Sequence, residues 1–267
     1  RNEKENKKKL IMFATETENN LSKEYLDNGY VIRPADDIES LEWIRNQFVQ
    51  LIRYALPKKI DIEAENLLNN IHKYMSVSEL NDFRLNLIQG INSIDGFREK
   101  YFKVARVYLE GLVGNELAMQ RRVNLSIQIP GDDSSLLPLH ADVWSGDSPF
   151  EVVLWVPLVD CFSTKSMFIV SPGVDRDVQS KLSDHTTSSS DDLYKLVESD
   201  AKFVNIKYGQ VLLFSQTLMH GNRINNEKTT RWSMNCRFKS LLSPYSDKRL
   251  GEFFEPITMR AATKFGL

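Results

Sequence analysis

Two histidines and one aspartate are spaced so that their side chains could bind a single metal ion. His140 and Asp142 are separated by one residue, and in an extended segment side chains two residues apart point to the same side. A third ligand has to come from elsewhere; only four histidines occur, and His220 follows the apolar run 211–214. Two imidazoles and one carboxylate suit a divalent transition metal such as Fe(II) and leave coordination positions open for other ligands. The sequence therefore predicts a metal site built from His140, Asp142 and His220.

A cationic side chain follows the third predicted ligand and suits a bound carboxylate. Arg231 comes eleven residues after His220, and strand alternation places Ser233 on the same face. A guanidinium pairs bidentately with a carboxylate, and a hydroxyl can assist. We therefore expect Arg231 and Ser233 to bind the distal carboxylate of a dicarboxylate held on the metal. Arg237 shares the face but lies about 20 Å farther along the strand, so we expect it to be too far from the metal.

The order of these motifs resembles a known enzyme family. His-x-Asp, a distant histidine and a later Arg-x-Ser are similar to the signature of the Fe(II)/2-oxoglutarate-dependent dioxygenases, in particular the phytanoyl-CoA dioxygenase-like group. Residues 153–160 and 166–173 also resemble that family's second strand and its later strand ending in Pro-Gly. The likeness covers residues 120–240 and is closest to oxygenases of bacterial carbohydrate-biosynthesis clusters. The family often continues with Gly-Ser-His, whereas this chain has Ser-Pro-Gly-Val at 171–174, so the substrate is not carried over from the family.

The resemblance implies a fold, cofactors and a reaction. The fold is a double-stranded β-helix, a jelly-roll or cupin-like barrel, with the metal at its open end. The implied cofactors are Fe(II), 2-oxoglutarate as co-substrate and O2, with His140, Asp142 and His220 as metal ligands and catalytic residues. The implied reaction couples oxidative decarboxylation of 2-oxoglutarate to hydroxylation of a small molecule, and desaturation and epimerisation stay open. Because the Asp142 carboxylate is intact, hydroxylation is favoured over halogenation. The expected substrate is a sugar or sugar conjugate of surface-carbohydrate biosynthesis, and the alternative is an amino acid or an acyl thioester.

Further residues are candidates for the co-substrate and substrate sites. Asn124, Ser126 and Gln128 share one face of the strand before the His-x-Asp loop. By resemblance this strand gives polar groups to 2-oxoglutarate, with Gln128 and Asn124 as candidates, although an exposed polar face fits equally well. Trp155 stands where the family packs a tryptophan beside the co-substrate, and a core role is the competing interpretation. Candidates for substrate contact at the mouth of the barrel are Trp144, Asp147 and Glu151, and the competing interpretation is surface-loop residues without a role.

These motifs follow a change in the hydrophobic period of the chain. Apolar residues recur at helical spacing in 38–56, 62–74, 77–91 and 97–113. Ser78 and Asp95 are candidate N-caps for the last two of these helices. Strand-like runs follow at 123–129, 150–158, 166–170, 203–206, 211–214 and 232–238. Residues 175–199 form a polar insertion, with one short helix expected near 193–197. The pattern predicts an α+β protein with its helices on one side of a sheet and a sandwich or barrel as the β component.

Length and composition fit one large domain. The chain has 267 residues, 42% of them hydrophobic and 26% charged, which allows a sizeable packed core. We divide it into a flexible N-terminal tail, 1–20, and a single oxygenase domain, 21–267, with a helical part at about 38–115 and a jelly-roll core at about 120–240. A net charge of −2 argues against a nucleic-acid partner. The expected partner is a small molecule, and the oligomeric state stays open.

The cysteine count and the apolar runs bear on location. The two cysteines, Cys161 and Cys236, are far apart and form no Cys-x-x-Cys pair, which favours a reducing compartment and small buried thiols. No apolar run approaches the roughly 20 residues that span a bilayer. We therefore expect a soluble cytoplasmic protein.

Two other functions fit some of the same residues. A cupin-like, metal-dependent sugar isomerase or epimerase would share the barrel and the metal ligands but would need no 2-oxoglutarate, and the Arg-x-Ser spacing would be a coincidence. A non-catalytic carbohydrate-binding jelly roll would keep three ligands without chemistry. Replacing Arg231 by Ala separates the first alternative from an oxygenase, because only the oxygenase should lose 2-oxoglutarate affinity.

Overall fold

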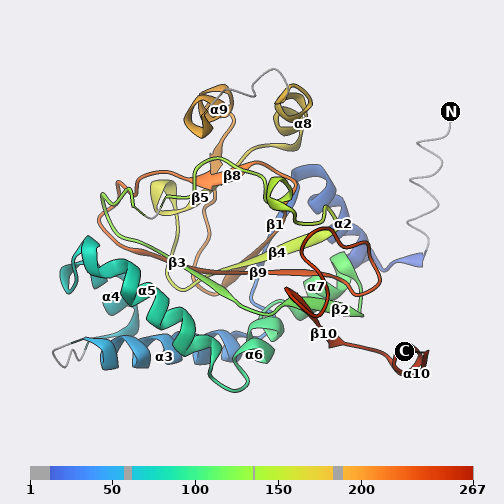
Figure 1. Cartoon of the computed structure of the whole chain (residues 1–267), viewed down its shortest axis with the longest axis horizontal. Coiled ribbons are helices and arrows are strands. Elements are labelled where there is room, and N and C mark those ends of the chain that lie inside the picture. Colours follow the sequence, from blue (N-terminus) through green and yellow to red (C-terminus); the bar gives the residue numbers. More distant parts are fainter. Residues whose placement is uncertain (1–12, 57–61, 135, 183–188, 267) are drawn as a thin grey trace.

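Figure 1 shows the computed structural model of the chain, which describes residues 13–56, 62–134, 136–182 and 189–266. The expected tail, 1–20, lies mostly outside these residues. Helix α2 (Glu16–Asn28) begins within that range, and the Thr15 side chain caps it by accepting a hydrogen bond from the Glu18 backbone N–H. The helical structure therefore starts earlier than the sequence pattern indicated.

The larger of two sheets is antiparallel and carries the long strand β9 (Arg231–Ser240). Its strand order is β1 (Tyr30–Pro34), β7 (Gln210–Ser215), β4 (Glu151–Pro157), β9, β2 (Leu117–Gln120) and β10 (Phe254–Thr258). Strand β3 (Asn124–Gln128) pairs with the first half of β9, and β2 pairs with its second half. In the β3–β9 register Gln128 lies opposite Arg231 and Ser126 opposite Ser233, so these side chains share one face of the sheet.

The smaller sheet faces the larger one across the core of the domain (Figure 1). Its order is β6 (Lys202–Phe203), β5 (Met167–Ile169) and β8 (His220–Asn222), and an isolated bridge pairs His140 with His220. The expected α+β class with a double-stranded β-helix core is confirmed. The two sheets enclose the space that the candidate side chains enter.

A layer of helices covers the outer face of the larger sheet (Figure 1). Its members are α3 (Ile38–Ala55), α4 (Ala64–Asn69), the 3-10 turn η2 (Ile71–Lys73), α5 (Val77–Asn92), α6 (Phe97–Lys103) and α7 (Arg106–Val113). Trp232 is fully buried against this layer, in edge contact with Phe48 and Phe83, and its indole N–H donates to the Leu68 carbonyl. Because side chains alternate along a strand, the burial of Trp232 against the helices turns Arg231 and Ser233 toward the inside of the barrel.

Several boundaries differ from the sequence expectation. Residues 97–113 form two helices, α6 and α7, instead of one. The caps are also shifted: Ser76, in a capping box with Glu79, starts α5 instead of Ser78, and Gly96, in the left-handed region at φ 78°, precedes α6 instead of Asp95. The sequence pattern also missed the short strands β2, β8 and β10, and the short elements η3 (Asp142–Ser145), η4 (Ser163–Lys165) and α10 (Ala261–Gly266).

The insertion at 175–199 is a structural part of the fold within its described residues, since 183–188 lie outside them. It contains two helices, α8 (Pro172–Ser180) and α9 (Ser190–Val197), which cover the outer face of the smaller sheet (Figure 1). Val178, Leu193 and Val197 pack there with Leu139 and Met219, the neighbours of two predicted ligands. The expectation of a single helix in this insertion is therefore wrong, and the apolar side of α8 and α9 packs against the segments that carry His140 and His220.

The described helices include none that is both long and apolar enough to cross a membrane.

Candidate metal centre and its cavity

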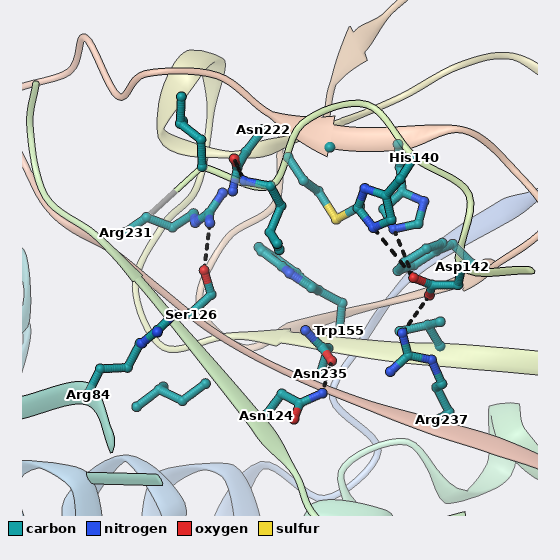
Figure 2. Close-up of a pocket in the computed structure, with 18 of the residues that line it drawn as sticks. Arg84, Asn124, Ser126, His140, Asp142, Trp155, Asn222, Arg231, Asn235 and Arg237 are labelled. Carbon is teal, nitrogen blue, oxygen red and sulfur yellow. Dashed lines mark hydrogen bonds and ion pairs between the residues drawn. The ribbon is translucent and has the colours of Figure 1, made fainter. Parts of the chain in front are cut away.

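The structure brings His140, Asp142 and His220 to one point, and Figure 2 shows His140 above Asp142 at this place. One ligand atom from each residue lies within 4.8 Å of the others. His140 Nε2 is 3.5 Å and His220 Nε2 is 3.9 Å from Asp142 Oδ1. Neighbouring ligands of a six-coordinate ion with bonds of about 2.1 Å are roughly 3 Å apart, so a small closure of this arrangement fits an ion.

Pairing of the backbone explains why the two imidazoles converge. His140 and His220 exchange two backbone hydrogen bonds, of 3.0 and 2.8 Å, as an antiparallel pair. Directly opposed residues of an antiparallel pair project to the same side. Asp142 follows two residues later at the start of η3, and its backbone N–H donates to the Gln216 carbonyl at 3.1 Å. The His-x-Asp spacing thus places the carboxylate beside both rings.

The outer nitrogen of each ring is already bonded to the backbone. His140 Nδ1 lies 2.7 Å from the Pro138 carbonyl oxygen, and His220 Nδ1 lies 2.8 Å from the Leu218 carbonyl oxygen. A carbonyl oxygen only accepts hydrogen bonds, so each Nδ1 carries the proton and each Nε2 presents a lone pair to the centre. This is the tautomer that a metal-binding histidine needs, and the donor set fits Fe(II).

Electrostatics keep the centre ready for a cation. Burial alone would raise the pKa of Asp142, but His140, His220 and Arg237 together lower that pKa well below its usual range. Burial lowers the pKa of His220 to about 4. Burial also acts to lower the pKa of His140, but its contact with the Asp142 carboxylate outweighs this and raises the pKa above the ordinary value. The carboxylate is therefore ionised, and His220 is neutral at neutral pH.

A chain of buried charges supports Asp142 from the side away from the histidines. Arg237 Nη2 lies 2.9 Å from Asp142 Oδ2, and Arg237 Nε lies 3.3 Å from Asp147 Oδ1. Lys248 Nζ lies 3.2 Å from the other oxygen of Asp147. The expectation that Arg237 is too far from the metal is therefore wrong. Arg237 lies beside the metal ligand Asp142, and Arg231, six residues earlier on the same strand, lines the same cavity.

A cavity of about 460 Å³ connects the metal centre with Arg231. Side chains from both sheets line it, together with Ser134, Leu136, Leu137 and residues of helix α5. Its polar lining residues are Arg84, Asn124, Ser126, Ser134, Asn222, Arg231, Asn235 and Arg237, in addition to the triad. Trp155 of β4 also lines the cavity and is 5% exposed. The volume is sufficient for small-molecule ligands.

Arg231 is a buried cation without a counter-ion among the described residues. It is 2% exposed, and its Nη2 donates to Ser126 Oγ at 2.7 Å. Its Nε has no hydrogen-bond partner, and no carboxylate of the described residues forms an ion pair with it. Burial lowers the pKa of Arg231 to about 10. A buried guanidinium without an anion is costly, so this end of the cavity is suited to receive a carboxylate.

Other predicted co-substrate residues lie beside Arg231 with unequal access. Asn124 lines the cavity, and its amide donates to Asn235 Oδ1 at 3.0 Å. Ser233 and Gln128 share the face but do not line the cavity. Both are buried, and among the described residues Ser233 Oγ and Gln128 Oε1 have no hydrogen-bond partner. Gln128 Nε2 instead donates to the Arg223 carbonyl at 2.6 Å.

The three residues predicted to contact substrate lie outside the cavity lining. Trp144 is 40% exposed, and its indole N–H donates to Gln179 of α8. Asp147 is buried in the charge chain with Arg237. Glu151 is 1% exposed, and it accepts hydrogen bonds from the Ser148 backbone N–H and the Gln216 amide. Both carboxylates are therefore buried and bonded to groups of the protein, and neither lines the cavity.

Sequence reasoning missed some of the polar lining. Arg84 comes from α5, whose helical pattern gave no sign that one side faces a cavity. Asn235 could have been found, because it continues the alternation of Arg231 and Ser233 along β9. Asn222 holds the loop: its side-chain oxygen accepts from the Leu137 backbone N–H at 2.7 Å.

Comparison with solved structures identifies the fold. No protein-family model matches the sequence, and no curated protein matches it. The nickel complex of the non-heme monooxygenase ThoJ matches with a TM-score of 0.57 and 15% identity, over 91% of this chain and 85% of that chain. HygX from Streptomyces hygroscopicus, solved with nickel and 2-oxoglutarate bound, matches with a TM-score of 0.52 and 14% identity, over 89% of this chain and 90% of that chain. EctD from S. alaskensis, in its apo form, matches with a TM-score of 0.50 and 14% identity, over 85% of this chain and 78% of that chain. The chain thus has the double-stranded β-helix fold that it shares with the non-heme monooxygenase ThoJ and with HygX, which was solved with 2-oxoglutarate bound.

Proposed function

We propose that the protein is a non-heme Fe(II)/2-oxoglutarate-dependent oxygenase that hydroxylates a small molecule. The observation that carries the proposal is the composition of one cavity. Three convergent ligand atoms, from His140, Asp142 and His220, lie at one end, and the buried Arg231, without a counter-ion, lies at the other. A dicarboxylate with a keto group next to one carboxylate has the chemistry to bind both ends.

The residues that line the cavity have separate roles in this proposal. His140, Asp142 and His220 would hold ferrous iron, and Arg231 with Ser126 would hold the distal carboxylate of 2-oxoglutarate. Iron bound there would activate O2: 2-oxoglutarate would lose CO2 and take one oxygen atom to become succinate, and the other atom would enter a C–H bond of the substrate as a hydroxyl group. Trp155 and Asn124 line the cavity between these ends. The match to HygX, solved with 2-oxoglutarate, supports the choice of co-substrate.

The substrate proposal is less specific. A sugar or sugar conjugate is our candidate from the sequence resemblance, and the Asn124–Asn235 amide pair in the cavity suits hydroxyl groups. The reducing, cytoplasmic setting that we propose fits the two cysteines, which are free and buried. Single-domain organisation over residues 21–267 also stays a proposal.

Binding of 2-oxoglutarate tests the function without knowledge of the substrate. Calorimetric titration of the Fe(II)-loaded protein, under anaerobic conditions, should show one 2-oxoglutarate site that disappears when the metal is omitted. Arg231→Ala should lose most of this affinity, and Arg122→Ala, which removes an exposed arginine, should keep it. Admission of air should then release succinate. A protein that binds the metal but shows no metal-dependent binding of 2-oxoglutarate would contradict the proposal and favour the metal-dependent isomerase.

A further inference from the structure

We propose that the cavity contains a second anion-binding subsite, centred on Arg84 of α5, which holds a carboxylate or phosphate group of the substrate. The inference rests on the proposed function, since it assigns to the substrate the part of the cavity that the metal and 2-oxoglutarate leave free. It names the substrate class as a small organic anion.

The lining of the cavity carries an excess of positive charge. Arg84, Arg231 and Arg237 all line the cavity, whereas Asp142 is the only carboxylate among its described lining residues. Arg237 is already paired with Asp142 and Asp147, and Lys248 completes that chain, so its two cations and two anions balance. A divalent metal ion and the dianion of 2-oxoglutarate also balance each other. The positive charges of Arg231 and Arg84 remain, which favours an anionic substrate.

Arg84 lies on the face of α5 that lines the cavity. Arg84 and Ile88 are four residues apart on α5, so they share a helix face, and both line the cavity. Phe83 and Leu87, on the adjoining face, are buried in the core. Figure 2 shows the Arg84 side chain directed from α5 toward the part of the cavity where Ser126 lies. The guanidinium therefore faces the cavity instead of being carried outward with the exposed side of the helix.

Arg84 has N–H donors that are not used by the hydrogen bond of its guanidinium, which goes to Asn81. Its Nη2 donates to Asn81 Oδ1, on its own helix, at 2.9 Å. None of the described carboxylates forms an ion pair with Arg84, although four of the five other half-buried arginines among the described residues pair with a carboxylate: Arg33, Arg98, Arg223 and Arg237. A guanidinium carries five N–H donors, so Arg84 can still bind an oxyanion in a bidentate manner.

Arg84 and Arg231 differ in the ligand that each can reach. Arg231 is fully buried and bonded to Ser126, which suits the compact, enclosed co-substrate. Arg84 is half-exposed and lies on a helix outside the barrel, where a larger molecule can be anchored by one end. The Asn124–Asn235 amide pair lines the same cavity and leaves further amide donors and acceptors for the polar body of that molecule.

Binding of simple oxyanions tests the subsite without the true substrate. The probes are inorganic phosphate and acetate, added to protein in excess over Mn(II) with saturating 2-oxoglutarate. Mn(II) in the triad enhances the relaxation of phosphorus or methyl-proton resonances of a probe bound nearby, and titration gives the dissociation constant. We expect Arg84→Gln to weaken binding of the preferred probe about tenfold, which corresponds to about 1.4 kcal/mol. Arg84→Lys, which keeps the charge, should recover part of the loss, and Arg122→Gln should behave as the native protein.

Each alternative outcome has a definite meaning. Equal probe affinities in the native protein and in Arg84→Gln, with the melting temperature unchanged, would overturn the subsite. Loss of 2-oxoglutarate affinity in Arg84→Gln would also overturn it, because Arg84 would then belong to the co-substrate site. The titration is repeated with Mn(II) alone: probe binding that depends on Arg84, in a protein that never binds 2-oxoglutarate, would support the subsite while removing the proposed function.

Discussion

Arg237 and Asp142 form a buried ion pair in which the two oxygens of the Asp142 carboxylate have different partners. Arg237 Nη2 holds Asp142 Oδ2 at 2.9 Å, while Asp142 Oδ1 faces the two histidine Nε2 atoms at 3.5 and 3.9 Å. The guanidinium is itself fixed by Gln216, which accepts from its Nε at 3.2 Å, and by Asp147. Asp142 Oδ1 is thus free to bind a metal ion, whereas Asp142 Oδ2 is occupied by the ion pair with Arg237. This arrangement therefore favours coordination through a single carboxylate oxygen and keeps the remaining positions open.

Removal of this support should weaken metal binding. Substitution of groups that orient metal ligands commonly costs about 10–100-fold in affinity, and we expect a loss in this range for Arg237→Gln. Arg237→Lys should lose less, because an ammonium keeps the charge but not the fork that contacts Asp142 and Asp147 together. Competition with a coloured chelator gives the Mn(II) or Fe(II) affinity of each variant.

A double-mutant cycle separates orientation from a general loss of structure. Asp147→Asn should weaken metal binding through Arg237, so its effect should largely disappear in the Arg237→Gln background. Arg231→Gln serves as the matched control, since it removes a buried arginine of the same strand far from Asp142. Additive effects of the two substitutions, or a loss of metal affinity in Arg231→Gln as well, would contradict the orienting role.

Arg231 should reduce the stability of the ligand-free protein. Its guanidinium is buried without a counter-ion, and replacement of buried charges by apolar residues of similar volume is often stabilising. We expect Arg231→Met to raise the free energy of unfolding by about 1–3 kcal/mol. For a chain of this size that corresponds to about 2–4 °C in melting temperature per kcal/mol. The same variant should lose binding of 2-oxoglutarate.

Calorimetry and thermal denaturation, with and without the metal and 2-oxoglutarate, check both halves of this prediction. The native protein should gain stability from the co-substrate, and Arg231→Met should gain none. Arg98→Met is a useful contrast, because Arg98 pairs with Glu255 and its loss should be destabilising. A destabilised Arg231→Met would show that Arg231 serves the fold and not a ligand.

The sequence predicted side-chain faces well and positions along a strand poorly. Strand alternation predicted that Arg231 and Ser233 share a face, and the β3–β9 register places them so, because the period of a strand is a local property. The place of Arg237 depends on where Asp142 meets β9, and that is set by the pairing of His140 with His220, which are far apart in the chain. A local sequence pattern therefore does not predict which residue of β9 contacts Asp142.

Charged residues posed a second difficulty for the sequence analysis. Asp147 and Glu151 follow the His-x-Asp motif in a polar stretch, which suggested an exposed mouth. Both are buried because partners from distant segments, Arg237 and Lys248 for Asp147 and Gln216 for Glu151, satisfy them. Burial of a carboxylate depends on such partners, and the sequence alone does not show which residues they are.

The metal affinity should decrease as the pH is lowered, and each metal ion that binds should displace one proton and not two. The pKa of His140 is raised by Asp142, whereas burial lowers the pKa of His220 to about 4. As pH falls through the raised pKa of His140, the metal-free protein takes up a proton on His140 that an entering metal must displace. The logarithm of the affinity should therefore fall by about one per pH unit below that pKa, until His220 also titrates. Titration in buffers of different ionisation enthalpy counts the protons released, and release of two near pH 6 would contradict the assignment.

A glycine lets the two histidine-bearing segments meet. Gly221 follows His220 on β8, and an added Cβ would lie 2.9 Å from both the Leu137 and Pro138 carbonyl oxygens. The Asn222 backbone N–H donates to that Leu137 carbonyl at 2.9 Å, and Pro138 also accepts from His140. The close approach of the loop to β8 thus requires the absence of a side chain at this position.

Gly221→Ala should therefore displace the loop and weaken metal binding without unfolding the protein. The two shortest contacts are with backbone oxygens, and this crowding is relieved only if the segment 137–140 shifts, which moves His140 relative to His220. Because a shift of about 1 Å in a site is enough to impair it, we expect at least a tenfold loss of Mn(II) affinity, measured by chelator competition. Gly173→Ala is the matched control: an added Cβ there meets nothing within 4 Å, so metal affinity should be unchanged. Native affinity in Gly221→Ala would show that the loop adapts without moving the ligand.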